Sequence, residues 1–181
     1  MKARHLVLML LSALGGKIES KTKLYKELYF ISLTLNKDLG FKPHYYGPYS
    51  PEVELGIDEL VGAGFVNMNR EVYGQDREKG FEFKKYDFSL TESGEKFVRN
   101  LKVNSPKEYD QINDFVRKLQ EIGDPDYLSL SLSAKAYYIL KQEGEGGMTR
   151  EQIKEKAKTF KWDVSENDIN TAVDILKKLG L

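Results

Sequence analysis

The chain has 181 residues, of which 40% are hydrophobic and 31% are charged, a composition typical of a soluble globular protein with a substantial core. Its 28 basic and 28 acidic residues cancel, which excludes a global electrostatic attraction to nucleic acid or to an anionic membrane. The absence of cysteine excludes disulfides, thiolate zinc sites and cysteine nucleophiles, and it is compatible with the reducing cytoplasm, where we expect the protein to reside.

The first predicted element is a helix at residues 3–14, where nearly every residue is apolar. Such a helix is covered by other elements on most sides, and Gly15 and Gly16 end it. Lys2 and Arg4 before the apolar run superficially resemble a secretory signal, but the same residues fit a core helix. The run is too short to span a membrane, and no membrane segment is predicted elsewhere.

A second helix is predicted at residues 21–36, because leucine and isoleucine recur there at helical spacing and form one buried stripe. The lysines of this helix lie off that stripe. They are Lys21, Lys23 and Lys26.

The most informative segment is residues 44–52, called the tyrosine joint below, where tyrosines alternate with backbone-restricting residues. Pro48 fixes its own φ and disfavours the right-handed helical region for Gly47. Ser50 followed by Pro51 is the N-cap and first-turn pair that starts a helix. We therefore predict a rigid aromatic joint between two helices.

The helix that follows the joint is predicted to end near Gly62, with Gly64 as its terminator. No lysine or arginine lies between Pro51 and Val66, and this helix carries several acidic residues. A helix that reads the major groove presents Arg, Lys, Asn or Gln to the bases, so we expect phosphates to repel this one.

Two extended segments, residues 65–73 and 81–90, are separated by a polar turn and predict a β-hairpin. The aromatic residues of the second segment change face partway along it. We therefore predict a bulge near Lys84 and Lys85.

Thr91 starts a further helix, and the segment Ser-Pro-Lys-Glu beginning at Ser105 predicts a capping box with proline at the first helical position. The helix at residues 106–121 carries five large apolar residues on one side. Since this is more than a surface helix usually needs, we consider a homodimer through it. The turn at residues 123–126 marks a sub-domain boundary.

After the boundary, leucines alternate with serines at residues 128–132, a pattern compatible with both a strand and a helix. Thr149 and Gln152 predict a capping box for a short helix. Ser165 caps a last helix, and Gly180 terminates it.

The element order predicts a mostly α-helical protein with a small antiparallel hairpin (α+β), organised as a winged helix-turn-helix. We assign residues 1–122 to the winged-helix domain with C-terminal extension helices. Residues 127–181 form a small three-helix sub-domain. It resembles a degenerate second copy, because residues 60–65 and 176–181 both place an apolar residue after a helix-ending glycine, although chance similarity is an equal alternative.

The segment Leu90-Thr91-Glu92-Ser93-Gly94, read together with the tyrosine joint, resembles the YwgA-type proteins and their relatives in the Panacea antitoxin-like group. The resemblance covers roughly residues 3–120. It implies a winged-helix fold with a regulatory or partner-neutralising role rather than catalysis, and no catalytic residue carries over from it.

Two sets of residues are candidates for binding. A cationic set on the first two helices and on the hairpin turn is the candidate for nucleic acid, with an ordinary solvated surface as the alternative. It comprises Lys17, Lys21, Lys23, Lys26, Arg77 and Lys79. A set in the tyrosine joint is the candidate for a protein partner, because tyrosine is enriched at interfaces, with packing of the joint as the alternative. It comprises His44, Tyr45, Tyr46 and Tyr49.

No catalytic, metal-binding or phosphate-binding pattern is present in the sequence, so we predict a protein without enzymatic activity, cofactor or metal. The two functional hypotheses are a DNA-binding transcription regulator that contacts double-stranded DNA, and a protein-interaction module, antitoxin-like or adaptor, that uses the tyrosine joint. Salt dependence separates them, because binding to DNA weakens steeply with salt.

Overall fold

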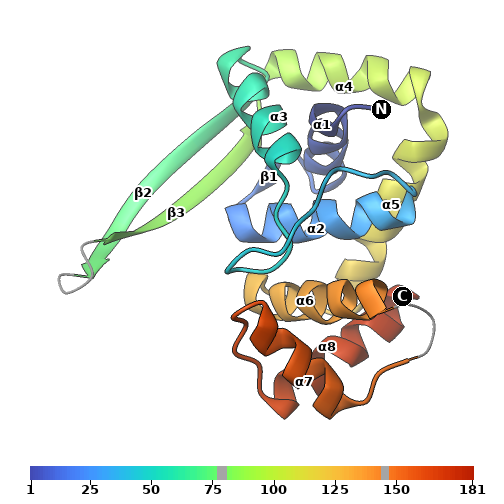
Figure 1. The fold of residues 1–181 in the computed structure, drawn as a ribbon. Helices are drawn as coiled ribbons and strands as arrows, with labels where there is room; N and C mark the ends of the chain where they lie inside the picture. The colour runs from blue at the N-terminus through green and yellow to red at the C-terminus, as the bar shows by residue number, and fades with distance from the viewer. Residues whose placement is uncertain (77–80, 144–146) are drawn as a thin grey trace.

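The computed structural model describes residues 1–76, 81–143 and 147–181, and within them a small antiparallel sheet extends from a body of helices (Figure 1). The elements are, in order, α1 (Ala3–Ala13), β1 (Lys17–Ile18), α2 (Lys21–Thr34), α3 (Pro51–Gly62), β2 (Val66–Asp76), β3 (Phe81–Leu90), α4 (Glu92–Asn104), α5 (Pro106–Glu121), α6 (Tyr127–Glu143), α7 (Arg150–Thr159) and α8 (Glu166–Leu179). The prediction of a mostly helical α+β protein with a small antiparallel hairpin is confirmed. Among the described helices, none combines the length and the apolar character needed to cross a bilayer.

The sheet contains a strand that the sequence did not predict. Strand β1 pairs Lys17 with Ser89 and Ile18 with Phe88 of β3, so the strand order is β1-β3-β2 and β2 forms an edge. With two residues, β1 is too short to show the alternation that identifies a strand. Because Ile18 and Phe88 are both buried, this pairing ties the base of the hairpin to the core.

Strands β2 and β3 form the predicted hairpin, which projects away from the helical body (Figure 1). The register shift between the strands lies on β2, between Val72 and Gly74, where Tyr73 is the extra residue. The prediction of a bulge at Lys84 and Lys85 therefore placed it on the wrong strand. The predicted turn lies partly in residues 77–80, outside the described residues.

The side-chain caps predicted at Ser50, Thr149 and Ser165 are present, and the last two belong to complete capping boxes. The cap predicted at Ser105 is absent. Ser105 also ends α4, where its N–H donates to the carbonyl of Leu101 at 2.8 Å, and its backbone conformation (φ −144°, ψ 57°) does not bring the hydroxyl to the next helix. The backbone of Ser105 serves both helices, because its carbonyl accepts from the N–H of Tyr109 in α5 at 3.1 Å, but its side chain caps neither.

Helix α2 is buried on more sides than its apolar stripe predicts. Lys26 is 3% exposed and Glu27 is 0% exposed, although both are charged residue types. The prediction that Lys26 lies off the buried face is wrong, because α6 packs against the side of α2 that the stripe leaves free. Sequence periodicity describes one helix and does not reveal a second neighbour from a distant part of the chain.

The main core continues across the predicted sub-domain boundary. Leu130 of α6 and Leu176 of α8 belong to the same buried cluster as α1 and α2, while Trp162 belongs to a smaller cluster between α6, α7 and α8. Residues 128–132, which the sequence left open between strand and helix, lie within α6. The division into residues 1–122 and 127–181 stays a prediction.

The apolar face of α5 is used inside the chain. Ile112, Phe115, Val116 and Leu119 are all buried in the main core. The reason for expecting a homodimer through this helix therefore falls away.

The start of α4 explains the Leu-Thr-x-x-Gly pattern in physical terms. The hydroxyl of Thr91 accepts from the N–H of Gly94 at 3.0 Å and donates to the carbonyl of Gly64 at 2.7 Å. A Cβ on Gly94 would overlap the carbonyl oxygen of Phe65. The Thr91 side chain thus ties the first turn of α4 to the segment that enters β2. Only glycine fits at position 94, where the helix meets the carbonyl of Phe65.

Candidate functional site

The backbone of the tyrosine joint is held by three hydrogen bonds from side chains on other elements. The pairs, donor first, are Trp162 Nε1 with His44 O (2.6 Å), Ser131 Oγ with Tyr46 O (2.6 Å) and Lys26 Nζ with Pro48 O (2.7 Å). The acceptors are carbonyls of alternate residues, so one edge of the joint is bonded to the body. The donors come from α2, from α6 and from the segment before α8, and the joint runs between α2 and the C-terminal helices (Figure 1).

Gly47 makes the tight turn within the joint. Its φ is 96°, and its N–H donates to the carbonyl of His44 at 2.9 Å. A Cβ at this position would lie 3.2 Å from Lys135 Cγ and 3.4 Å from Lys26. A glycine is therefore required both by the left-handed conformation and by the two lysine side chains beneath the turn.

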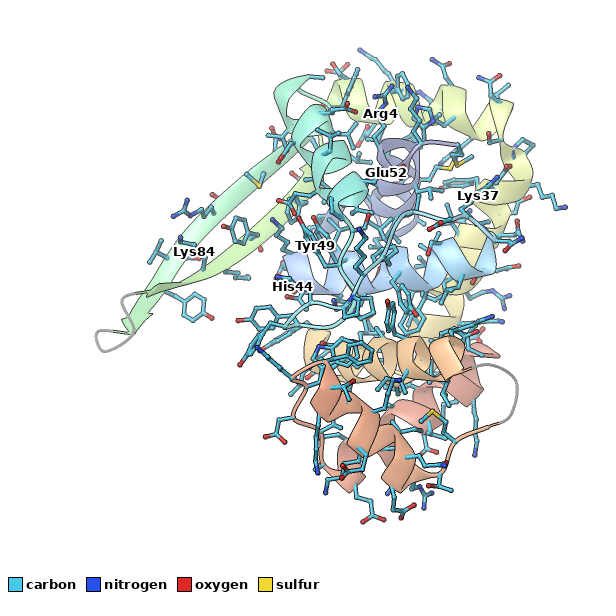
Figure 2. All side chains as sticks on the ribbon, in the orientation of Figure 1. Arg4, Lys37, His44, Tyr49, Glu52 and Lys84 are labelled. Carbon is cyan, nitrogen blue, oxygen red and sulfur yellow. The ribbon has the colours of Figure 1, made fainter. Side chains whose placement is uncertain are left out.

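The tyrosines of the joint divide into two groups. Tyr45 and Tyr46 are 69% and 60% exposed, and their rings meet edge to face with centroids 4.9 Å apart. Tyr49 instead stacks on the buried Tyr25 (5.4 Å, 5°), and His44 lies against Tyr49 at 5.2 Å; Figure 2 shows these two labelled side chains beside α2. The joint thus presents Tyr45 and Tyr46 on a backbone that the rest of the protein fixes.

A polar network lies behind Tyr49. Lys21 Nζ is 2.6 Å from Glu54 Oε1, and the hydroxyl of Tyr25 donates to the same carboxylate. Burial alone would raise the pKa of Glu54, but the bonds from Lys21 and Tyr25 hold it below its ordinary value. The ammonium of Lys21 also lies over the rings of Tyr25 and Tyr86, at 5.8 and 5.4 Å from their centroids. The ammonium group of Lys21 is therefore already paired with groups of the protein itself.

The other candidate cations do not gather on one surface. Lys23 is bonded to Asp124 at 2.6 Å, and its side chain is 17% exposed. Lys26 is buried and bonded to the joint. Lys17 is exposed beside Glu19. Arg77 and Lys79 lie outside the described residues.

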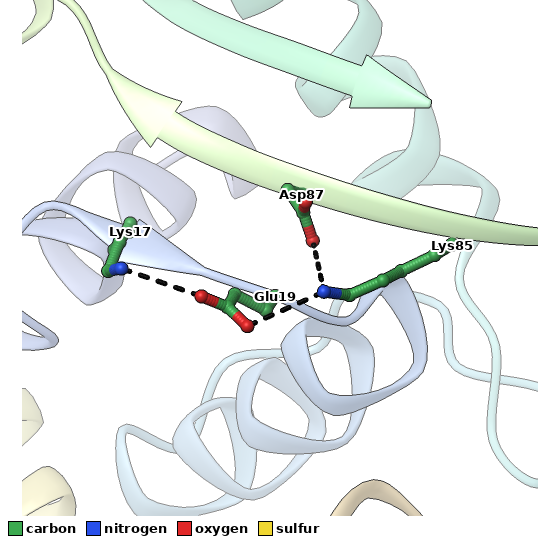
Figure 3. A network of polar contacts seen from close by, with 4 residues as sticks. All are labelled: Lys17, Glu19, Lys85 and Asp87. Carbon is green, nitrogen blue, oxygen red and sulfur yellow. Dashed lines mark hydrogen bonds and ion pairs between the residues drawn. The ribbon is translucent and has the colours of Figure 1, made fainter. Parts of the chain in front are cut away.

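At the base of the hairpin, cations and carboxylates alternate (Figure 3). Glu19 accepts from Lys17 at 3.4 Å and from Lys85 at 3.5 Å, and Lys85 is 3.6 Å from Asp87. The hydrogen bond from Lys17 and the charge of Lys85 lower the pKa of Glu19, while the charge of Asp87 raises the pKa of Lys85. This network is balanced in charge, so it offers a phosphate no net attraction.

The exposed side of α3 is acidic, as the sequence predicts. Glu54 and Glu59 are bonded to Lys21 and Arg4, each at 2.6 Å. Glu52 and Asp58 are exposed, and no described residue forms an ion pair with either. Since like charges repel, this side of the helix disfavours the DNA backbone.

Sequence reasoning missed the residues that anchor the joint from the C-terminal helices. Trp162 and Ser131 lie 118 and 85 residues from their acceptors. Trp162 is the only tryptophan of the chain, which makes it conspicuous without indicating its contact. Among residues 1–76, 81–143 and 147–181, no group of three or more histidine or acidic side chains lies close enough together to hold a metal ion.

Comparison with known proteins adds one relative. No protein-family model matches the chain. The chain is 30% identical over 164 residues to a protein of Bacillus subtilis (strain 168) named Uncharacterized protein YwgA, and the match covers 89% of this chain and 86% of the relative.

Proposed function

The chain belongs to the YwgA family, and on that premise we propose that it is a non-enzymatic winged-helix regulatory protein that binds another protein through Tyr45 and Tyr46. The same proposal includes an antitoxin-like or adaptor role and a relation to the Panacea antitoxin-like group. It also includes residence in the cytoplasm.

The observation that carries this proposal is the rigid presentation of two exposed tyrosines. Binding normally costs the entropy of ordering a loop and its side chains. Here the hydrogen bonds to the carbonyls of His44, Tyr46 and Pro48 order the joint before any partner arrives. Tyrosine supplies a large apolar area with a polar tip, and such residues are frequent hot spots of protein interfaces.

The winged-helix assignment rests on element order. The succession α1-β1-α2-α3-β2-β3, with the sheet order β1-β3-β2, is the arrangement expected for a winged helix with β2 and β3 as the wing. In this arrangement α3 takes the place of the recognition helix. Its acidic exposed side supports a protein partner over the major groove of DNA.

The partner-binding role predicts the effect of removing both exposed rings. The double variant Tyr45→Ala/Tyr46→Ala should lose at least about thirtyfold in affinity for its partner, because truncation of even one aromatic hot spot costs about 2 kcal/mol or more. Tagged protein purified from its native host, with mass spectrometry of stoichiometric partners, provides the measurement. The double variant should melt at the wild-type temperature, since neither ring is buried.

The matched control is Tyr127→Ala, which removes an equally exposed tyrosine (55%) from the start of α6. It should retain the partner in full. A partner that the double variant retains, or the absence of any stoichiometric partner, would count against the proposal.

DNA binding remains a second candidate, because the element order is that of a winged helix. Under the first proposal, duplex DNA at a physiological salt concentration of about 150 mM should show no binding tighter than the non-specific range of about 10⁻⁴–10⁻⁶ M. Fluorescence anisotropy with labelled duplexes makes this measurement. Tighter binding that falls steeply with salt, and that Lys17→Ala/Lys21→Ala/Lys23→Ala abolishes, would favour the DNA candidate instead.

A further inference from the structure

A second concave site lies at the far end of α2 from the tyrosine joint. It is a groove of about 350 Å³ between the end of α2, the loop that follows it and α6. Figure 2 shows Lys37, which lines it, toward the opposite end of α2 from His44. Its volume falls in the lower part of the range of small-molecule sites, about 300–1,000 Å³.

The groove is lined by a tyrosine whose hydroxyl has no hydrogen-bond partner within the described residues. Tyr29 is 4% exposed as a residue, and its hydroxyl keeps some access to solvent. Burial raises the pKa of Tyr29 above its ordinary value, and the nearby hydroxyls of Tyr137 and Tyr138 raise it further. The hydroxyls of Tyr137 and Tyr138 likewise have no hydrogen-bond partner in the described part of the chain. Three O–H donors thus lie near one another without an acceptor.

Two lysines flank these hydroxyls. Lys37 comes from the loop and is half-buried, and Lys141 comes from α6 and is exposed. Among the described residues neither forms an ion pair, and the ammonium of Lys141 lies 5.9 Å from the ring centroid of Tyr137. Asp38, the acidic side chain that lines the groove, accepts instead from the N–H of Gly40 at 2.8 Å. A ligand thus meets two ammonium groups and three tyrosine hydroxyls, with Asp38 as an acidic side chain in the same groove.

The walls beside the donors are aromatic and fixed. Phe41 meets Tyr29 edge to face at 5.1 Å, and Tyr138 lies 6.4 Å from Tyr29. The loop is held by the bond from the N–H of Lys37 to the carbonyl of Ser32, at 2.8 Å. The groove thus places aromatic side chains beside the donors.

We propose that this groove binds a small aromatic anion, a single ring that carries a carboxylate or a phosphate, with the anionic group received by Lys37, Lys141 and the hydroxyl of Tyr29. The ring lies against Phe41 and Tyr138. Hydrogen bonds in which the acceptor is ionised are stronger than neutral ones, so the anionic group supplies most of the specificity.

The test is isothermal titration of the full chain with phenyl phosphate and with benzoate. At least one should bind with a Kd of about 1 mM or tighter, as expected for a ligand of this size at a few tenths of a kcal/mol per atom. Phenol and inorganic phosphate, which each carry half of the recognised chemistry, should bind at least about tenfold more weakly. The comparison of phenyl phosphate with benzoate identifies which anion the site prefers.

Two variants connect binding to this groove. Lys37→Ala/Lys141→Ala should weaken binding about tenfold or more, and Tyr29→Phe, which keeps the ring and removes the hydroxyl, should weaken it about fivefold, in line with hydrogen bonds to a charged group. Lys107→Ala, an exposed lysine on α5, is the matched control and should bind as the wild type does. Failure of both ligands to bind the wild type, or equal affinity in all variants, overturns the proposal.

Discussion

Gly94→Ala should lower the free energy of unfolding by about 3 kcal/mol, the upper part of the usual cost of overpacking. The added Cβ would overlap the carbonyl oxygen of Phe65, which is backbone and cannot rotate away. The same carbonyl accepts from the N–H of Thr91 at 3.1 Å, so relief of the overlap must separate α4 from the entry of β2. Urea denaturation followed by circular dichroism gives the free energy directly.

The matched control is Gly62→Ala in α3, where a Cβ would meet nothing within 4 Å. Because alanine favours a helix over glycine, this variant should be as stable as the wild type or more stable by up to about 1 kcal/mol. If Gly94→Ala proves as stable as Gly62→Ala, then α4 does not need a glycine where it meets Phe65, and the explanation of the Leu-Thr-x-x-Gly pattern fails.

The features that were predictable from the sequence are those decided within a few residues. Ser50, Thr149 and Ser165 cap their helices, because each side-chain oxygen accepts a hydrogen bond from the backbone N–H only three residues further along the chain. The hairpin was predictable for the same reason, since alternation and turn residues are local signals. Ser105 shows the limit of such reasoning, because it is the C-cap of α4 as well as the residue before α5, and its backbone conformation leaves α5 without a side-chain cap.

The features that the sequence did not reveal depend on contacts between distant segments. Lys26 looks like a solvent-exposed lysine in the repeat of α2, yet it is buried, and its ammonium group donates a hydrogen bond to the carbonyl of Pro48 in the joint. The same limit applies to the joint: that Gly47 lies outside the right-handed helical region was predictable from Pro48, but the bonds from Trp162 and Ser131 were not. The candidate cations were identified by residue type, and only tertiary structure shows that Lys21 and Lys23 are already paired.

The buried acid of α2 should make stability depend on pH in a defined direction. Glu27 is 0% exposed, and neither carboxylate oxygen has a hydrogen-bond partner among the described residues. Burial raises its pKa from 4.5 to about 8; the charge of Lys23 opposes this shift and that of Asp124 adds to it. Between these two values the folded protein holds a proton that the unfolded chain releases. The free energy of unfolding contributed by Glu27 therefore falls as the pH rises, by up to about 1.4 kcal/mol per pH unit, and it is constant above the higher value.

The adjacent Lys26 acts in the opposite direction at higher pH. Burial, with a further effect of the nearby Lys135, lowers the pKa of Lys26 from 10.5 to about 7. Between these values the unfolded chain holds more protons than the folded protein, so this contribution to stability rises with pH. The two effects oppose each other between about pH 7 and pH 8, and the wild-type profile alone cannot separate them.

The difference between Glu27→Gln and the wild type separates them, because Lys26 is present in both proteins. Glutamine has the size of protonated glutamate and never ionises, so the variant should gain stability relative to the wild type by several kcal/mol between about pH 5 and pH 8. Above that range the difference in stability between the variant and the wild type should stay constant. Urea denaturation at half-unit steps of pH measures the free energy of unfolding as a function of pH. Glu27→Leu should show the same dependence on pH as Glu27→Gln, since it also lacks the carboxyl group, although its stability at any one pH can differ. Parallel curves for all three proteins would mean that Glu27 is ionised and solvated in the folded state, contrary to its burial between α2 and its neighbours.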